Sequence, residues 1–135
     1  MTSLLPDRVA IAERSLARRI LIADDAPSSR ELLRTILERQ GYIVQEAADG
    51  RQAVDEALDF LPDLIILDLQ MPRLDGYAAA IALRKIPGLE GIPIIALAAA
   101  LPEVSPEQMT QAGFTQCLVK PISPNRLREC VTELL

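Results

Sequence analysis

Four residues with reactive side chains directly follow short apolar runs in this chain. Asp24 and Asp25 follow the first run, Asp68 follows the third, and Lys120 follows the fifth. Ligands of an open parallel sheet bind beyond the carboxyl ends of its strands. If the runs are parallel strands, we therefore expect three carboxylates and one ammonium group to meet at one edge of the sheet.

Three carboxylates at close range repel one another and raise each other's affinity for protons. A hard divalent cation such as Mg²⁺ or Mn²⁺ relieves this repulsion, and Mg²⁺ is often held by one or two carboxylates together with water and phosphate oxygens. One carboxylate can then attack phosphorus to give an acyl phosphate. The predicted chemistry is phosphoryl transfer to Asp68, with the metal and Lys120 neutralising charge on the phosphoryl oxygens.

Each of these residues alone has a simpler interpretation. Adjacent acids before Pro and Ser are common helix caps, and most lysines are solvated on the surface. The functional interpretation depends on the joint placement of Asp24, Asp25, Asp68 and Lys120 at successive strand ends.

Short apolar strands alternate with helical segments along most of the chain. The predicted strands are residues 20–23, 42–44, 64–67, 92–97 and 117–119. The predicted helices begin at Ser28, Asp49, Gly76, Ser105–Pro106 and Ser123–Pro124. Continuous apolar strands indicate a sheet covered on both faces, and the repeated strand–helix order indicates parallel pairing with right-handed crossovers. The predicted fold class is therefore α/β, with five strands and five helices.

The sequence predicts caps, apolar faces and end points for the helices. Ser28 with Glu31, and Ser105 with Gln108, have the spacing of a capping box. The expected apolar stripes are Leu32, Leu33, Ile36 and Leu37 on the first helix and Ala53, Val54, Ala57 and Leu58 on the second. Gly41 and Gly113 are placed to end the first and fourth helices.

Length and composition narrow the function classes. The chain has 135 residues, which favours one domain over 19–135 preceded by an N-terminal extension over 1–18. The formal net charge of −5 disfavours binding to nucleic acid or to an anionic membrane. Two cysteines outside any CxxC pattern and no transmembrane-length apolar run favour a cytoplasmic protein. The chain has no histidine, so it cannot be its own phosphohistidine donor.

The ordered set of motifs resembles the receiver domains of two-component response regulators, in the stand-alone form known from chemotaxis regulators. The motifs are Asp24–Asp25, then Asp68 with Met71–Pro72 and Gly76 after it, then Lys120–Pro121. The resemblance covers residues 18–135. It implies a flavodoxin-like, doubly wound five-stranded parallel sheet of order 2-1-3-4-5. It also implies a cis Lys120–Pro121 bond, and a sensor histidine kinase or histidine phosphotransfer protein as phosphoryl donor.

The resemblance assigns a role to each matching position. Asp68 corresponds to the phosphoacceptor, and Lys120 to the lysine that pairs with the phosphoryl group. Asp25 corresponds to the direct ligand of Mg²⁺ or Mn²⁺, Asp24 to an acid that holds the metal through water, and the backbone carbonyl of Gln70 to a third protein ligand. Such a domain is not an enzyme on other substrates, because it catalyses at most its own phosphorylation and dephosphorylation.

Two positions depart from the family pattern. Receivers carry Thr or Ser where this chain has Ala98, and Tyr or Phe where it has Cys117. One lost hydrogen bond to a charged group is worth roughly 1.5–3 kcal/mol, so phosphorylation is expected to be about 10- to 100-fold slower. The usual switch is also expected to be altered, which leaves open a pseudo-receiver that binds proteins without phosphorylation.

Two other classes fit less well. A hydrolase with an aspartyl-phosphate intermediate would place an acid two residues after its nucleophile, where this chain has Gln70. A flavin or dinucleotide binder would need a Gly-rich loop after the first strand. No output domain follows the last predicted helix, so we expect the response to pass through an unidentified downstream protein. The resemblance to receivers implies that this protein binds around 105–112, 117–119 and 124–131.

Overall fold

The computed structural model describes residues 17–99 and 105–135, and the predicted extension over 1–18 lies almost wholly outside this part. A five-stranded parallel sheet forms the centre of the molecule, with strand order β2-β1-β3-β4-β5. The strands are β1 (Arg19–Ala23), β2 (Ile43–Ala47), β3 (Leu64–Asp68), β4 (Ile94–Ala98) and β5 (Gln116–Val119). The predicted sheet, its parallel pairing and its order are therefore confirmed.

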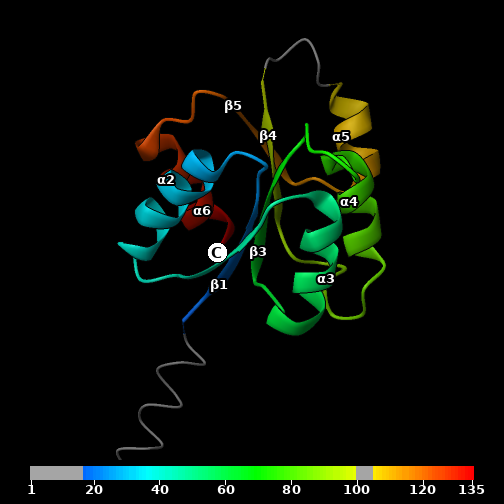
Figure 1. The fold of residues 1–135 in the computed structure, drawn as a ribbon, viewed down its shortest axis with the longest axis horizontal. Helices are drawn as coiled ribbons and strands as arrows, with labels where there is room; N and C mark the ends of the chain where they lie inside the picture. Colours follow the sequence, from blue (N-terminus) through cyan, green and yellow to red (C-terminus); the bar gives the residue numbers. More distant parts are fainter. Residues whose placement is uncertain (1–16, 100–104) are drawn as a thin grey trace, which may run out of the picture.

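Helices cover both faces of the sheet, as Figure 1 shows. The helices in the described residues are α2 (Pro27–Glu38), α3 (Gly50–Phe60), α4 (Gly76–Arg84), α5 (Pro106–Ala112) and α6 (Pro124–Leu134). Helices α2 and α6 lie on one face, and α3, α4 and α5 lie on the other. This arrangement is the doubly wound, flavodoxin-like fold that the sequence predicts.

The two faces of the sheet carry separate apolar cores. Every residue of β3 and β4 is buried, which explains why these strands read as continuous apolar runs. Alternate residues point to opposite faces, so Ile65 and Leu67 pack under α3 and α4 while Leu64 and Ile66 pack under α2 and α6. The strand that ends in Asp68 is thus fixed from both sides.

Three of the predicted helix starts are confirmed by their caps. Asp49, Ser105 and Ser123 each accept a hydrogen bond from the backbone N–H three residues on. Gly113 ends α5 in the left-handed conformation, with φ of 94°, where a glycine is favoured.

The predicted start of the first helix at Ser28 was wrong. Helix α2 begins at Pro27, its N-cap is Ala26, and no side chain caps it. Proline is favoured at the first helical position because its fixed φ suits the helix and it has no N–H to satisfy. Ser28 therefore lies inside the first turn, and the capping box with Glu31 does not form.

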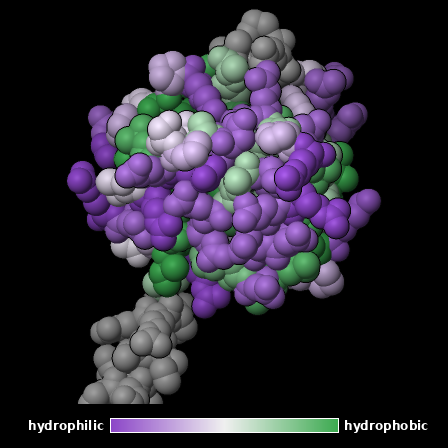
Figure 2. All heavy atoms as spheres, in the orientation of Figure 1, coloured by the Kyte–Doolittle hydropathy of each residue, from purple (hydrophilic) through white to green (hydrophobic). Residues whose placement is uncertain are grey.

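Two residues of the predicted apolar stripes are exposed. Leu32 and Leu58 are 53% and 54% exposed. Successive residues of a helix are about 100° apart, and Leu33 and Ala57, their buried neighbours, occupy the direction that faces the sheet. Figure 2 shows a face covered mostly by hydrophilic side chains, with small apolar patches between them.

Arg84 joins the end of α4 to the end of α5. Its guanidinium donates hydrogen bonds to the carbonyls of Gly113, Leu89, Glu90 and Ile92. Burial lowers the pKa of Arg84.

Within the described residues, no helix is long and apolar enough to cross a membrane.

Candidate functional site

Asp24 and Asp25 lie in the loop between β1 and α2, and their environments differ. The Asp24 side chain is fully buried, and its Oδ1 accepts a hydrogen bond of 2.9 Å from the backbone N–H of Ala26. The Asp24 N–H donates to the Ala47 carbonyl at 3.2 Å, which ties the loop to the end of β2. Asp25 is exposed, with no hydrogen-bond or ion-pair partner in the part of the chain that the structure describes. Asp24 is therefore fixed, whereas the Asp25 carboxylate remains available to a ligand.

Asp68 is the last residue of β3 and is only 5% exposed. Its Oδ1 accepts a hydrogen bond of 3.0 Å from the Gln70 N–H, two residues further on. The start of α4 approaches this residue closely, since a Cβ on Gly76 would lie 2.4 Å from the Asp68 carbonyl oxygen. Glycine at position 76 thus lets the helix pack against the strand that ends in Asp68.

Lys120 follows β5 and connects the two buried acids. Its Nζ donates to Asp68 Oδ2 at 2.8 Å and to Asp24 Oδ2 at 3.2 Å. Its backbone N–H donates to the Ala98 carbonyl at 2.8 Å, which fixes it against the end of β4. The Lys120–Pro121 bond is cis, as the resemblance to receivers implies.

The three carboxylates converge as the sequence predicts. One carboxylate oxygen from each of Asp24, Asp25 and Asp68 lies within 4.8 Å of the others. Burial raises the pKa of Asp24, and the charge of Asp68 adds to this, while hydrogen bonds from Ala26 and Lys120 offset part of the effect. Burial alone would lower the pKa of Lys120, but its contacts with Asp68 and Asp24 outweigh burial and raise it.

The site is suited to a divalent cation. Three carboxylates and one ammonium group leave a formal charge of −2, which one divalent cation would neutralise. All the available donor atoms are oxygens, which hard cations such as Mg²⁺ prefer. Gln70 lies beside Asp68, because its N–H donates to Asp68 Oδ1.

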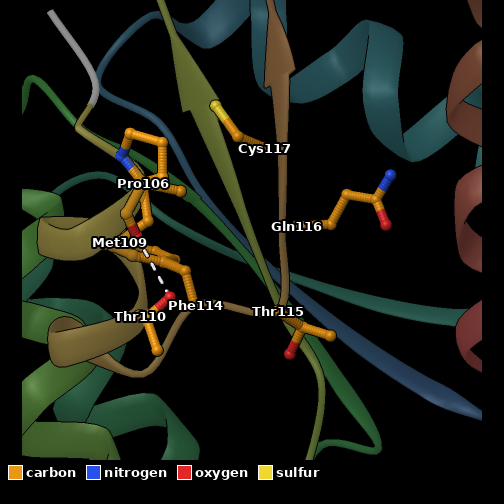
Figure 3. Close-up of a pocket in the computed structure, with 7 residues that line it drawn as sticks. All are labelled: Pro106, Met109, Thr110, Phe114, Thr115, Gln116 and Cys117. Carbon is orange, nitrogen blue, oxygen red and sulfur yellow. Dashed lines mark hydrogen bonds between the residues drawn. The ribbon is translucent and has the colours of Figure 1, made fainter.

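The two atypical positions, Ala98 and Cys117, lie on the same face of the sheet. Ala98 ends β4 and is buried, and Cys117 packs against the same core. A groove of about 320 Å³ lies between α5 and β5, and Figure 3 shows Cys117 among the residues that line it. Met109, Phe114 and Pro106 contribute to its lining. The small thiol of Cys117 completes one side of this groove.

One residue that the sequence did not mark as functional also touches the site. Arg30, on α2, donates a hydrogen bond to the backbone carbonyl of Asp24 at 2.7 Å. The sequence held no clear signal for it, because an arginine in an amphipathic helix is usually solvated.

Comparison with known proteins agrees with this geometry. The family model for the response regulator receiver domain matches residues 20–132. The chain is 34% identical to the chemotaxis protein CheY of Bacillus subtilis, over 89% of this chain and 99% of that protein. The structure of the chemotaxis protein CheY4 of Vibrio cholerae aligns with a TM-score of 0.82 at 33% identity, covering 88% of this chain and 99% of that one.

A further similar structure was solved with a metal. The receiver domain of the sensor histidine kinase PA1611 from Pseudomonas aeruginosa has a magnesium ion coordinated in its active-site cleft. It aligns with a TM-score of 0.80 at 33% identity, covering 87% of this chain and 97% of that one.

Several relatives are much longer than this chain. The chain is 39% identical to the transcriptional regulatory protein ResD of Bacillus subtilis and spans 48% of its length. It is 34% identical to the hybrid signal transduction histidine kinase I of Dictyostelium discoideum and spans 7% of that protein. Since the family model covers most of the chain and the fold, strand order and acidic edge all agree with it, the chain belongs to the response regulator receiver domain family of two-component signalling.

Proposed function

We propose that Asp68 accepts a phosphoryl group from a phosphohistidine of a partner protein, with Mg²⁺ or Mn²⁺ held by Asp24, Asp25, Asp68 and the backbone carbonyl of Gln70. The observation that carries this proposal is the pair of contacts from Lys120 to Asp68 and Asp24 beside an exposed Asp25. A buried acid paired with a lysine and adjoining an available carboxylate is what an acyl-phosphate site requires.

The transfer balances as a displacement at phosphorus. An oxygen of the Asp68 carboxylate forms a bond to phosphorus, the bond from phosphorus to the imidazole nitrogen breaks, and that nitrogen keeps the electron pair. Lys120, already 2.8 Å from Asp68 Oδ2, is placed to follow the charge from the carboxylate to the phosphoryl oxygens. The cation, when bound, neutralises charge on these oxygens and helps to orient them.

The donor is proposed to be a sensor histidine kinase or a histidine phosphotransfer protein, because the chain itself has no histidine. A hollow of about 190 Å³ opens next to Asp24 and Lys120, and its lining includes the apolar side chains of Leu32, Pro121 and Ile122. An apolar border around a charged centre suits a protein surface that presents one phosphorylated side chain. The domain is proposed to catalyse only its own phosphorylation and dephosphorylation.

The response to phosphorylation is proposed to be atypical. A ligand shifts a conformational equilibrium only through contacts that differ between the two states. Ala98 offers no hydroxyl to the phosphoryl group, and Cys117 offers no ring to move. The output is therefore proposed to be a local change of charge and shape around Asp68, read by a downstream partner.

These same two residues favour a second candidate, a pseudo-receiver that binds proteins without phosphorylation. The complete acidic cluster and its contacts with Lys120 support the phosphoacceptor instead. A module that bound no metal would have little use for three converging carboxylates, because their repulsion has a cost in stability.

One experiment separates the two candidates. The protein is incubated with Mg²⁺ and a small acyl-phosphate donor, and its intact mass is followed with time. We expect a gain of one phosphoryl group in the wild type and no gain in Asp68→Asn. The control Asp59→Asn changes an exposed acid on α3 and should gain the group as the wild type does. No gain in the wild type would favour the pseudo-receiver, and a gain in Asp68→Asn would show that another residue is the acceptor.

A further inference from the structure

Arg30 reaches from α2 to the back of the acidic loop. Its Nη1 donates to the Asp24 backbone carbonyl at 2.7 Å, and its Nε donates to Glu46 Oε1 on β2 at 3.1 Å. The side chain of Arg30 is 17% exposed, so both contacts are partly shielded from water. Arg30 therefore links the loop that carries Asp24 and Asp25 to the neighbouring strand.

Glu46 orients Arg30 because the glutamate is itself held in place. Its second oxygen, Oε2, accepts a hydrogen bond of 2.6 Å from Arg34 Nη1, and Arg34 also pairs with Glu38 at 3.3 Å. The hydrogen bond from Arg34, and then that from Arg30, lower the pKa of Glu46 against the opposing effect of burial. Glu46 thus stays charged between two guanidinium groups.

The contact at the Asp24 carbonyl has a geometric consequence for Asp25. This carbonyl and the Asp25 N–H belong to one planar peptide unit, so fixing the carbonyl oxygen fixes the plane that leads to the Asp25 Cα. The other polar atoms of Asp24 are held by Ala47, Ala26 and Lys120. Asp25 has no such contacts of its own within the described residues, so its backbone alone aims its carboxylate.

We propose that Arg30 is a positioning residue for the cation site: through the Asp24 carbonyl it sets the direction of the Asp25 carboxylate. This inference rests on the proposed function, because it takes Asp25 to be a metal ligand. Residues behind the direct ligands typically contribute about 10- to 100-fold to metal affinity. Because Arg30 acts through the backbone, we expect a contribution near the lower end of that range.

The test measures Mg²⁺ affinity by isothermal titration calorimetry in Arg30→Met and in the matched control Arg34→Met. We expect about tenfold weaker binding in Arg30→Met and a smaller loss, of about twofold, in Arg34→Met, because Arg34 acts on Arg30 only through Glu46. Loss of a positive charge near acids would by itself tighten cation binding, so weaker binding can come only from lost positioning. Glu46→Gln, which leaves Arg30 in place without its charged partner, is expected to give an intermediate loss and serves if Arg30→Met does not fold.

A second measurement needs no metal. The Ala26 N–H, which donates to Asp24 Oδ1, is expected to exchange with deuterium about tenfold faster in Arg30→Met than in the wild type or Arg34→Met. Unchanged Mg²⁺ affinity in Arg30→Met, or equal weakening in both arginine variants, would overturn the inference. If Asp25→Ala binds Mg²⁺ as the wild type does, the proposed cation site is wrong, while the exchange rates still decide whether Arg30 orders the loop.

Discussion

Replacement of Ala98 by threonine tests the chemistry of the site most directly. Ala98 ends β4, one residue beyond Leu97, which is the register partner of Asp68. Its carbonyl accepts the Lys120 N–H, so the backbone at this position is fixed beside the proposed phosphoryl site. A hydroxyl added here would supply the hydrogen bond to a phosphoryl oxygen that the alanine cannot make.

Two opposing effects set the size of the result. A hydrogen bond to a charged group is worth roughly 1.5–3 kcal/mol, and if it is fully made in the transition state the rate rises about 10- to 100-fold. Ala98 is only 1% exposed, so the two added heavy atoms have a packing cost of about 1–3 kcal/mol in folding free energy. We therefore expect Ala98→Thr to be less stable than the wild type but faster to phosphorylate.

The assay follows intact mass with time at fixed Mg²⁺ and a fixed concentration of the acyl-phosphate donor. Ala98→Val is the matched control, because valine has nearly the shape of threonine but no hydroxyl. The ratio of the Thr rate to the Val rate isolates the hydrogen bond from the packing cost. Equal rates in the two variants would refute the reasoning, since the hydroxyl would then make no contact in the transition state.

Three further outcomes are expected. In thermal unfolding, Mg²⁺ at about 100 times its Kd should stabilise the wild type by about 2.7 kcal/mol. Asp25→Ala should lose most of this stabilisation, and equal stabilisation of the two proteins would contradict the assignment of Asp25 as a ligand. The contacts of Glu46 lower its pKa in the folded state below the ordinary 4.5. They therefore stabilise the fold above pH 4.5, and this stabilisation is lost as the pH falls through the folded-state pKa. Glu46→Gln should therefore lose less unfolding free energy than the wild type between about pH 5 and pH 3, and parallel curves would count against this cause. In chemical denaturation, Gly76→Ala should lower the free energy of unfolding by about 2–4 kcal/mol, because its Cβ would meet the Asp68 carbonyl. Gly91 has open space around it, so the control Gly91→Ala should change this free energy by less than about 0.5 kcal/mol. Similar losses in the two variants would disprove the steric argument.

The fold could be predicted from the sequence because local and global signals agree. The apolar runs before Asp24 and Asp68 are buried strands, the run before Lys120 is a partly buried strand, and parallel order brings their carboxyl ends to one edge. The start of α2 was missed because Ser28 and Glu31 suggested a capping box. Pro27 was the better signal, as the serines before Pro106 and Pro124 show by capping α5 and α6.

Other features depend on tertiary contacts that periodicity cannot reveal. Leu32 belongs to the apolar pattern of α2 yet is exposed, because the arc of a helix that meets the sheet depends on how the helix is rotated. Arg30 reads as a surface residue, but the partner of its Nη1 is a backbone carbonyl, which every residue possesses and no pattern marks. The contacts of Lys120 could be predicted from the sequence only because charged residues at strand ends are unusual.

The contacts of Arg84 constrain how α5 can move. Its Nε and Nη2 donate to the Gly113 carbonyl at the carboxyl end of α5, and its Nη1 donates to carbonyls of the segment that leads into β4. Sliding α5 along the sheet as a unit would break the bonds at Gly113, while tilting the helix about that end would leave them intact. Helix α5 is therefore expected to pivot about Gly113. The displacement of its residues should be largest near Pro106 and smallest near Gly113, where Arg84 is bound.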